Sequence, residues 1–208
     1  MTGLLSSGSW RSMSRAKRIA YFSIFTAITI VMQFVPITFG PVNINMTLIP
    51  LVLCGMVLGF WYSLSLGAII GIVFLIQGIT GYEPFTGYLF YHSPIILTIT
   101  CVGKTAIAGG VGALIYQLLK DKNKYLATFL SAGIIPVVNT GIFVLGMLII
   151  KGSLYEFLES AGLEVAGMNP LYVILVIVVT WNFFVEFGLN LLFAPAIYRI
   201  IKAVDKGF

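Results

Sequence analysis

Charged residues are scarce in this chain, since only 9% of its 208 residues are Asp, Glu, Lys or Arg. An average soluble domain has about 25%. Because 59% of the residues are hydrophobic, too few polar side chains remain to coat a water-soluble globule of this size. The composition excludes a soluble domain and a disordered chain. It predicts an all-α integral membrane protein that crosses the bilayer several times.

Residues that carry metal or hydrolytic chemistry are also few. The chain has one His and two Cys, and Cys54 and Cys101 both lie in apolar runs. They cannot form a zinc or haem ligand set, so we expect no metal site and no cofactor. The sequence contains no Walker P-loop, no H-E-x-x-H and no G-x-S-x-G. We therefore expect a protein that is not an enzyme and cannot hydrolyse ATP alone.

Long apolar runs predict the membrane-spanning segments, because a helix needs about 20 apolar residues to cross the hydrocarbon layer. Residues 48–60 are short by this measure. Residues 88–119 are too long for one perpendicular span, so they must tilt, bend near Gly109 and Gly110, or leave the bilayer. The sequence predicts a single membrane domain, residues 19–201, with six spans at 19–35, 48–60, 64–79, 88–119, 125–150 and 171–201.

Basic residues are concentrated in three segments that six spans would place on one side of the membrane. Positive charge marks the cytoplasmic side, so we expect cytoplasmic segments at 1–18 and 202–208 and both termini inside. The net charge of +5 then reflects topology and contact with anionic lipid, and it needs no nucleic acid. The three segments contain Arg11, Arg15, Lys17 and Arg18; Lys120, Lys122 and Lys124; and Arg199, Lys202 and Lys206.

Three segments outside the spans carry further expectations. Met13 resembles a native start, so residues 1–12 would be an expression remnant or come from an alternative start. The irregular segments 36–47 and 151–170 have the length of lids or binding loops. For 151–170 a short amphipathic surface helix is an equal alternative.

Polar residues inside apolar spans are functional candidates, because burying them in lipid costs free energy unless they are paired. Asn182, Glu186 and Asn190 recur every four residues near one helical face, bordered by Trp181. They could bind an organic solute or form a hydrogen-bond network between helices. Asn139 follows Pro136, so it could reach a ligand or repair the proline kink.

Lys104 is a charge within an apolar run and needs a partner. Three possibilities remain open: Glu186, a substrate carboxylate, or the cytoplasmic interface reached by extension of the side chain. Gln77, Tyr82 and His92 add polar groups to the outer half. In the first span a stripe of small residues would let another helix approach closely, in a partner or in the same chain. The stripe consists of Ala16, Ala20, Ser23 and Ala27.

These features together resemble the substrate-binding S components of energy-coupling-factor (ECF) vitamin transporters. The resemblance covers residues 16–199 and depends on the order of several short motifs along six predicted helices. The motifs are Ala16-x-x-x-Ala20, Leu48-Ile49-Pro50, Gly55-x-x-x-Gly59-Phe60-Trp61-Tyr62-Ser63 with Gly67, Lys104-x-x-x-Ala108-Gly109, and Pro136-Val137-Val138-Asn139-Thr140-Gly141.

The resemblance implies a subunit in the plasma membrane of a prokaryote that binds a vitamin in its outer half. It also implies docking through the first span onto a membrane coupling (T) protein. Two cytoplasmic ATPases would supply ATP hydrolysis, and the whole S component would topple to carry the vitamin inward. The pattern at Asn139 and Asn182 is most similar to pantothenate S components, with hydroxymethylpyrimidine, folate and riboflavin as alternatives.

For pantothenate we expect a definite division of roles. Asn139 and Asn182 would donate and accept hydrogen bonds. Trp181 and Tyr82 would form walls, and Asn45 or Gln77 would close the top of the pocket. Lys104 would compensate the carboxylate, or backbone N–H groups around Pro136 would do so instead, while Glu186 would lie one layer behind the ligand.

Two other classes stay open. An autonomous small-solute facilitator needs a continuous polar stripe through several spans, whereas the inner halves here are mostly apolar. An integral membrane enzyme needs a cluster of acid, base or metal groups, for which Lys104 and Glu186 are too few.

Overall fold

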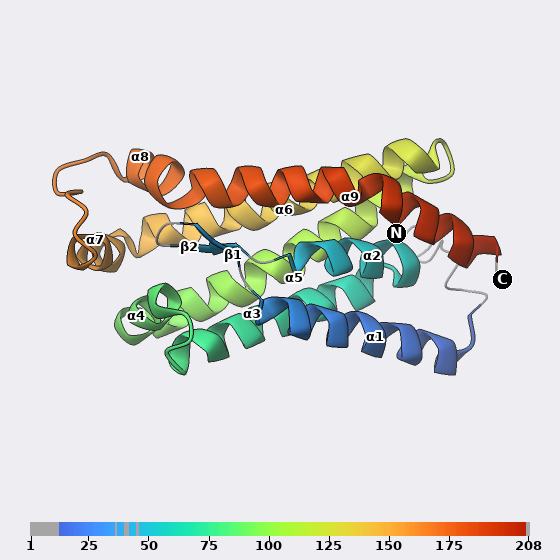
Figure 1. Ribbon diagram of the computed structural model, residues 1–208, viewed down its shortest axis with the longest axis horizontal. Coiled ribbons are helices and arrows are strands. Elements are labelled where there is room, and N and C mark those ends of the chain that lie inside the picture. Colours follow the sequence, from blue (N-terminus) through green and yellow to red (C-terminus); the bar gives the residue numbers. More distant parts are fainter. Residues whose placement is uncertain (1–12, 36, 40–41, 45, 207–208) are drawn as a thin grey trace.

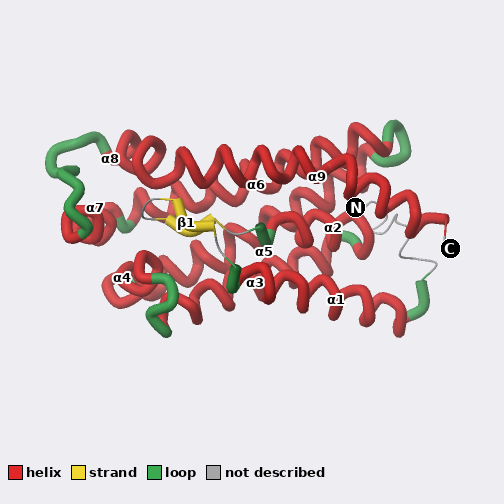
Figure 2. The backbone as a smooth tube through the Cα atoms, viewed as in Figure 1, coloured by secondary structure: helices red, strands yellow, loops and turns green. Residues whose placement is uncertain are grey.

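The computed structural model describes residues 13–35, 37–39, 42–44 and 46–206. Its helices run along one long axis (Figure 1), and a small hairpin, yellow in Figure 2, lies beside the middle of the bundle. The helices are α1 (Arg15–Gln33), α2 (Leu48–Leu58), α3 (Phe60–Ile79), α4 (Pro84–His92), α5 (Pro94–Leu119), α6 (Lys124–Ile149), α7 (Lys151–Ser160), α8 (Pro170–Tyr172) and α9 (Thr180–Lys206), with a π-helix, η3 (Val173–Val179), between the last two. In the hairpin, β1 (Ile37–Phe39) pairs antiparallel with β2 (Val42–Ile44).

Four described segments are long and apolar enough to cross a membrane: α3, α5, α6 and the continuous helix Pro170–Val204. The prediction of an all-α, multi-pass membrane protein is thereby confirmed. That the chain has six membrane spans stays a prediction. The second expected span is the 11-residue α2, which rises about 16 Å against a hydrocarbon layer of ~30 Å. The first corresponds to α1, a 19-residue helix whose first turn holds Arg15, Lys17 and Arg18.

The basic segments lie together in space. In Figure 1 the start of α1, the turn between α5 and α6 and the end of α9 are all at one end of the bundle, and α4 and α7 are at the other. This arrangement agrees with the charge pattern. That the basic end faces the cytoplasm stays a prediction, and we call it the basic end and the opposite one the outer end.

The long apolar run 88–119 is interrupted at Ser93, between α4 and α5, and not at Gly109 and Gly110. Pro94 begins α5, where its missing N–H costs nothing. At the outer end residues 151–160 form α7, as one alternative for this segment predicted. Leu154 and Leu158 of α7 are fully buried against the bundle, so this amphipathic helix packs across the outer end.

Close contact between α3 and α5 builds the centre of the bundle. A Cβ at Gly71 would lie only 2.5 Å from the carbonyl oxygen of Cys101, and one at Gly67 would overlap the carbonyl of Thr105. The Thr105 hydroxyl donates a 2.6 Å hydrogen bond to the Gly67 carbonyl. Small residues let helix backbones touch in this way, and the pairing fixes which residues of α5 face inward.

We expect Gly71→Ala to lower the free energy of unfolding by about 1–3 kcal/mol, because the added methyl group must push two backbones apart. Gly103→Ala, also in a central helix, is the matched control, since a Cβ there meets nothing within 4 Å. Thermal unfolding of both variants in detergent tests the contact. Equal stability of the two variants would contradict it.

Candidate functional site

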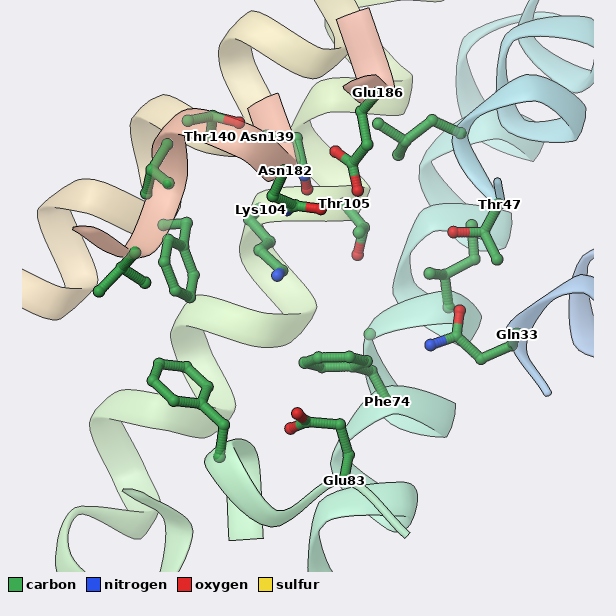
Figure 3. Close-up of a pocket in the computed structure, with 17 residues that line it drawn as sticks. Gln33, Thr47, Phe74, Glu83, Lys104, Thr105, Asn139, Thr140, Asn182 and Glu186 are labelled. Carbon is green, nitrogen blue, oxygen red and sulfur yellow. The ribbon is translucent and has the colours of Figure 1, made fainter. Parts of the chain in front are cut away.

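A cavity lies between two apolar cores of the bundle. One core surrounds α2 near the basic end, and the other joins α4, α7 and η3 at the outer end. The cavity has a volume of about 70 Å³, so it is narrow. Figure 3 shows the lining. Its polar members are Gln33, Thr47, Glu83, Lys104, Thr105, Asn139, Thr140, Asn182 and Glu186.

Lys104 projects into the cavity from α5. Its ammonium lies 4.9 Å from the ring centroids of both Phe74 and Phe143, within the range of cation–π attraction. Among the described residues no carboxylate lies within the 4.0 Å of an ion pair with this ammonium. Lys104 therefore presents a positive charge between two rings, and its partnership with Glu186 is not a direct ion pair.

Asn182 and Glu186 reach the cavity from α9. The Asn182 Oδ1 and Glu186 Oε2 atoms are buried, and neither has a hydrogen-bond partner among the described residues. Glu186 is buried and lines the cavity directly, and not from one layer behind, as we expected. Two acceptor atoms on adjacent turns of α9 are thus left for another molecule.

The π-helix η3 precedes these two residues. Its wide turn brings Val178 and Val179 to the cavity together with Asn182, which follows in α9. The Thr180 hydroxyl donates a 2.5 Å hydrogen bond to the carbonyl of Leu175, five residues back. Residues five apart are the ones that a π-helix pairs, so this hydrogen bond follows the π-helical spacing. π-helical turns are frequent at functional sites.

Asn139 faces the cavity from α6, three residues after Pro136, which lies inside the helix. It is buried, and its Oδ1 has no hydrogen-bond partner in the part of the chain that the structure describes. The amide is therefore available to a ligand on the side opposite Gln33 and Thr47 in Figure 3.

Gln33 and Gln77 close one side of the cavity by a pair of hydrogen bonds. Gln33 Nε2 donates to Gln77 Oε1 at 3.0 Å, and Gln77 Nε2 donates to the Gln33 carbonyl at 3.1 Å. Nearby, the Tyr82 hydroxyl donates to the carbonyl of Phe34 at 3.1 Å. These bonds join the end of α1 to the outer end of α3.

The structure brings four of the expected site residues into one cavity: Asn139, Asn182, Lys104 and Glu186. Gln77 lies behind Gln33. Tyr82 is 48% exposed and Trp181 is 69% exposed, and neither lines the cavity. Asn45 lies outside the described residues. The small-residue stripe of α1 is exposed along its length, at Ala16, Ala20, Ser23 and Ala27.

Five polar residues of the cavity lining were not among the site residues expected from the sequence: Gln33, Thr47, Glu83, Thr105 and Thr140. Glu83 is only 4% exposed, although its position between two spans suggests a solvated loop. The sequence feature that could have indicated the burial of Glu83 is Pro84. Proline favours the first position of a helix, which makes Glu83 the N-cap. Gln33 ends α1, and nothing in the local pattern pointed to a cavity there, whereas Thr47 belongs to the segment 36–47 that has the length of a lid or binding loop.

At the outer end α4 and α7 meet through an aromatic and acidic contact. The Tyr88 hydroxyl donates to Glu156 Oε2 at 3.4 Å, and the Tyr88 ring stacks on His92 at 4.2 Å. Partial desolvation and the adjacent Glu156 carboxylate raise the pKa of Tyr88. His92, an exposed residue, lies in this contact and does not line the cavity.

Comparison of the chain with known protein families, curated proteins and solved structures found no match. The site must therefore be interpreted from its own chemistry. It offers a positive charge, two carboxylates and several amide groups to a small polar solute. Within the described part of the chain no group of His, Cys, Asp or Glu could hold a metal ion.

We expect Glu186→Gln to raise the free energy of unfolding of the ligand-free protein by ~0.5–2 kcal/mol. A buried carboxylate with an unpaired oxygen is costly, and a neutral amide of the same shape removes that cost. Glu159→Gln, on the exposed surface of α7, is the control and should change stability by less than about 0.5 kcal/mol. Thermal unfolding decides, and a destabilised Glu186→Gln variant would mean that the protein already compensates this charge.

Proposed function

We propose that this chain is the substrate-binding subunit of an ECF-type vitamin importer and that pantothenate is its vitamin. The observation that carries the proposal is the narrow cavity inside a membrane protein. Its lining contains Lys104, which has no ion-pair partner among the described residues, and buried amide and carboxylate atoms that have no hydrogen bond to those residues. Leaving such atoms unpaired costs free energy, and a polar ligand that pairs them recovers it. The sequence resemblance to S components supports the same assignment.

Pantothenate matches the cavity group by group. Its carboxylate would face the Lys104 ammonium, which lines the cavity without an ion-pair partner among the described residues. Its amide and hydroxyl groups would pair with Asn139 and Asn182, which can both donate and accept. Phe74 and Phe143 supply apolar walls for the methyl groups.

Hydroxymethylpyrimidine is the second candidate, and a specific observation favours it. Among the described residues the cavity lining holds two carboxylates, Glu83 and Glu186, and one cation, so its formal charge disfavours an anionic ligand. An aminopyrimidine could donate to Glu186 and accept from Asn182. Folate and riboflavin are larger than either candidate and fit the narrow cavity less well.

The same proposal assigns the exposed side of α1 to the coupling protein. Phe25, Thr29 and Gln33 are the buried residues of α1, whereas the small-residue stripe remains open to a second helix. The subunit would then lie in a prokaryotic plasma membrane with its basic end inside. The membrane coupling protein and two ATPases would drive delivery of the vitamin.

Asn182→Ala should weaken pantothenate binding by about 1–3 kcal/mol, roughly tenfold or more, because it leaves polar atoms of the bound ligand unsatisfied. Calorimetry on purified protein measures the dissociation constant, after a thermal-shift screen of B vitamins has shown which one binds. At 100 times the dissociation constant a ligand stabilises by ~2.7 kcal/mol, which such a screen detects.

The matched control is Asn123→Ala, which removes an amide that caps α6 at the basic end, away from the cavity. It should leave affinity unchanged. If Asn182→Ala has the wild-type affinity, the ligand does not use α9. A Lys104→Met variant separates the candidates, since it should weaken the pantothenate anion far more than neutral hydroxymethylpyrimidine.

Ala20→Trp should abolish assembly with the coupling protein and ATP-dependent uptake while ligand affinity stays unchanged, because a large side chain separates two closely packed helices. Ala196→Trp, an exposed position of α9, is the control and should assemble normally. Reconstitution in liposomes with and without the partner subunits measures both. Concentrative uptake by the chain alone would reject the S-component assignment, and passive equilibration would favour a facilitator.

A further inference from the structure

Glu83 has two roles in the structure that are normally separate. As the N-cap of α4 its Oε2 accepts a 2.6 Å hydrogen bond from the Thr86 backbone N–H. Its own backbone N–H donates to the carbonyl of Gln77 at 3.1 Å. Both bonds hold the residue at the outer end of α3, and only 4% of it is exposed.

The same side chain lines the cavity. In Figure 3 the Glu83 carboxylate and the Lys104 ammonium both point into the space that the Phe74 ring borders. Lys104 is engaged with aromatic rings at 4.9 Å, and no ion pair joins it to Glu83 among the described residues. The cavity therefore holds opposite charges that the protein keeps apart.

Because the Glu83 and Lys104 charges do not pair with each other, both remain available to another molecule. An ionised carboxylate can accept about four hydrogen bonds, so the cap bond from Thr86 leaves acceptor capacity unused. Burying that capacity is costly unless a donor arrives. An ion pair between Glu83 and Lys104 would remove the cost within the protein, but among the described residues the two groups are not within the 4.0 Å of an ion pair. A ligand with both kinds of group can satisfy both.

We propose that Glu83 contacts the ligand and determines its specificity by accepting a hydrogen bond from a ligand hydroxyl or amino group, while Lys104 holds an acceptor or anionic group of the same molecule. This inference depends on the proposed function, because it takes a small polar solute as the occupant of the cavity. It adds Glu83 to the residues that contact the ligand. It also requires the ligand to carry a hydrogen-bond donor at the end that faces Glu83. Sites built to pair a ligand hydroxyl reject analogues that lack it.

The test compares pantothenate with an analogue in which hydrogen replaces both hydroxyl groups. For the wild-type protein, calorimetry should show roughly 10- to 100-fold tighter binding of pantothenate, as expected for hydrogen bonds to a charged group. Glu83→Gln should weaken pantothenate binding and leave the analogue unchanged, so that the ratio of the two affinities falls. An equal loss for both ligands would show that Glu83 acts only as a structural cap and would overturn the proposal.

Glu83→Asn separates capping from ligand contact. Asn is a strong N-cap residue, but its shorter side chain withdraws from the cavity and carries no charge. It should fold like the wild-type protein, capping α4, and show the same loss of discrimination as Glu83→Gln. Wild-type discrimination by this variant would contradict a direct contact. Glu159→Gln, an exposed neutralisation on α7, is the charge control and should retain the wild-type ratio.

Failure of the vitamin assignment is distinguishable from failure of this inference. If pantothenate does not bind the wild-type protein, that assignment fails, and the same variants are titrated with hydroxymethylpyrimidine and its analogue without the hydroxyl group.

A further measurement of the pairing between Glu83 and Lys104 needs no ligand. The effects of Glu83→Gln and Lys104→Met on thermal unfolding should add in the double variant. Strong coupling would mean that the two charges already pair, which would overturn the proposal.

Discussion

The contact of the α3 and α5 backbones determines the geometry of the cavity. Gly67 and Gly71 let α3 approach until the Thr105 hydroxyl reaches the Gly67 carbonyl. Lys104 precedes Thr105, and Phe74 lies one turn beyond Gly71, so one contact places both the cation and its aromatic neighbour. A wider spacing between these helices would let Lys104 leave its rings, and the cavity would lose its only positive side chain among the described residues.

The polar groups of the cavity are tolerated because apolar cores on both sides hold the bundle together. Toward the basic end α2 is almost completely buried, and toward the outer end α7 and η3 pack on α4. Between them Asn139, Asn182 and Glu186 keep acceptor atoms without partners. A fold optimised only for stability would pair or remove these atoms, so their persistence is consistent with a site that is completed by another molecule.

Much of the fold could be predicted, because apolar runs and basic segments report directly on a membrane environment. Lys104, Asn139, Asn182 and Glu186 stood out because each is polar within an apolar run, and the cavity contains all four. Trp181 was expected beside them from its place next to Asn182, but neighbours in a helix point about 100° apart, and Trp181 faces outward. Glu83 was missed because its burial depends on how α4 folds back. The pairing of Gln33 with Gln77 joins residues 44 positions apart, which no local pattern shows.

The π-helix η3 has a consequence for how chains of this kind can diverge. A π turn holds more residues than an α turn, so Val173–Val179 contains roughly one residue more than the same arc of α-helix would. A deletion of one residue there can be absorbed by rewinding to α, with Pro170 and Asn182 both left in place. Between Thr180 and Glu186 of α9 the same deletion would rotate Glu186 by about 100° relative to the helix before it, away from the cavity. Related chains could therefore vary in length within η3 and retain the same ligand, whereas the segment 180–186 must keep its length.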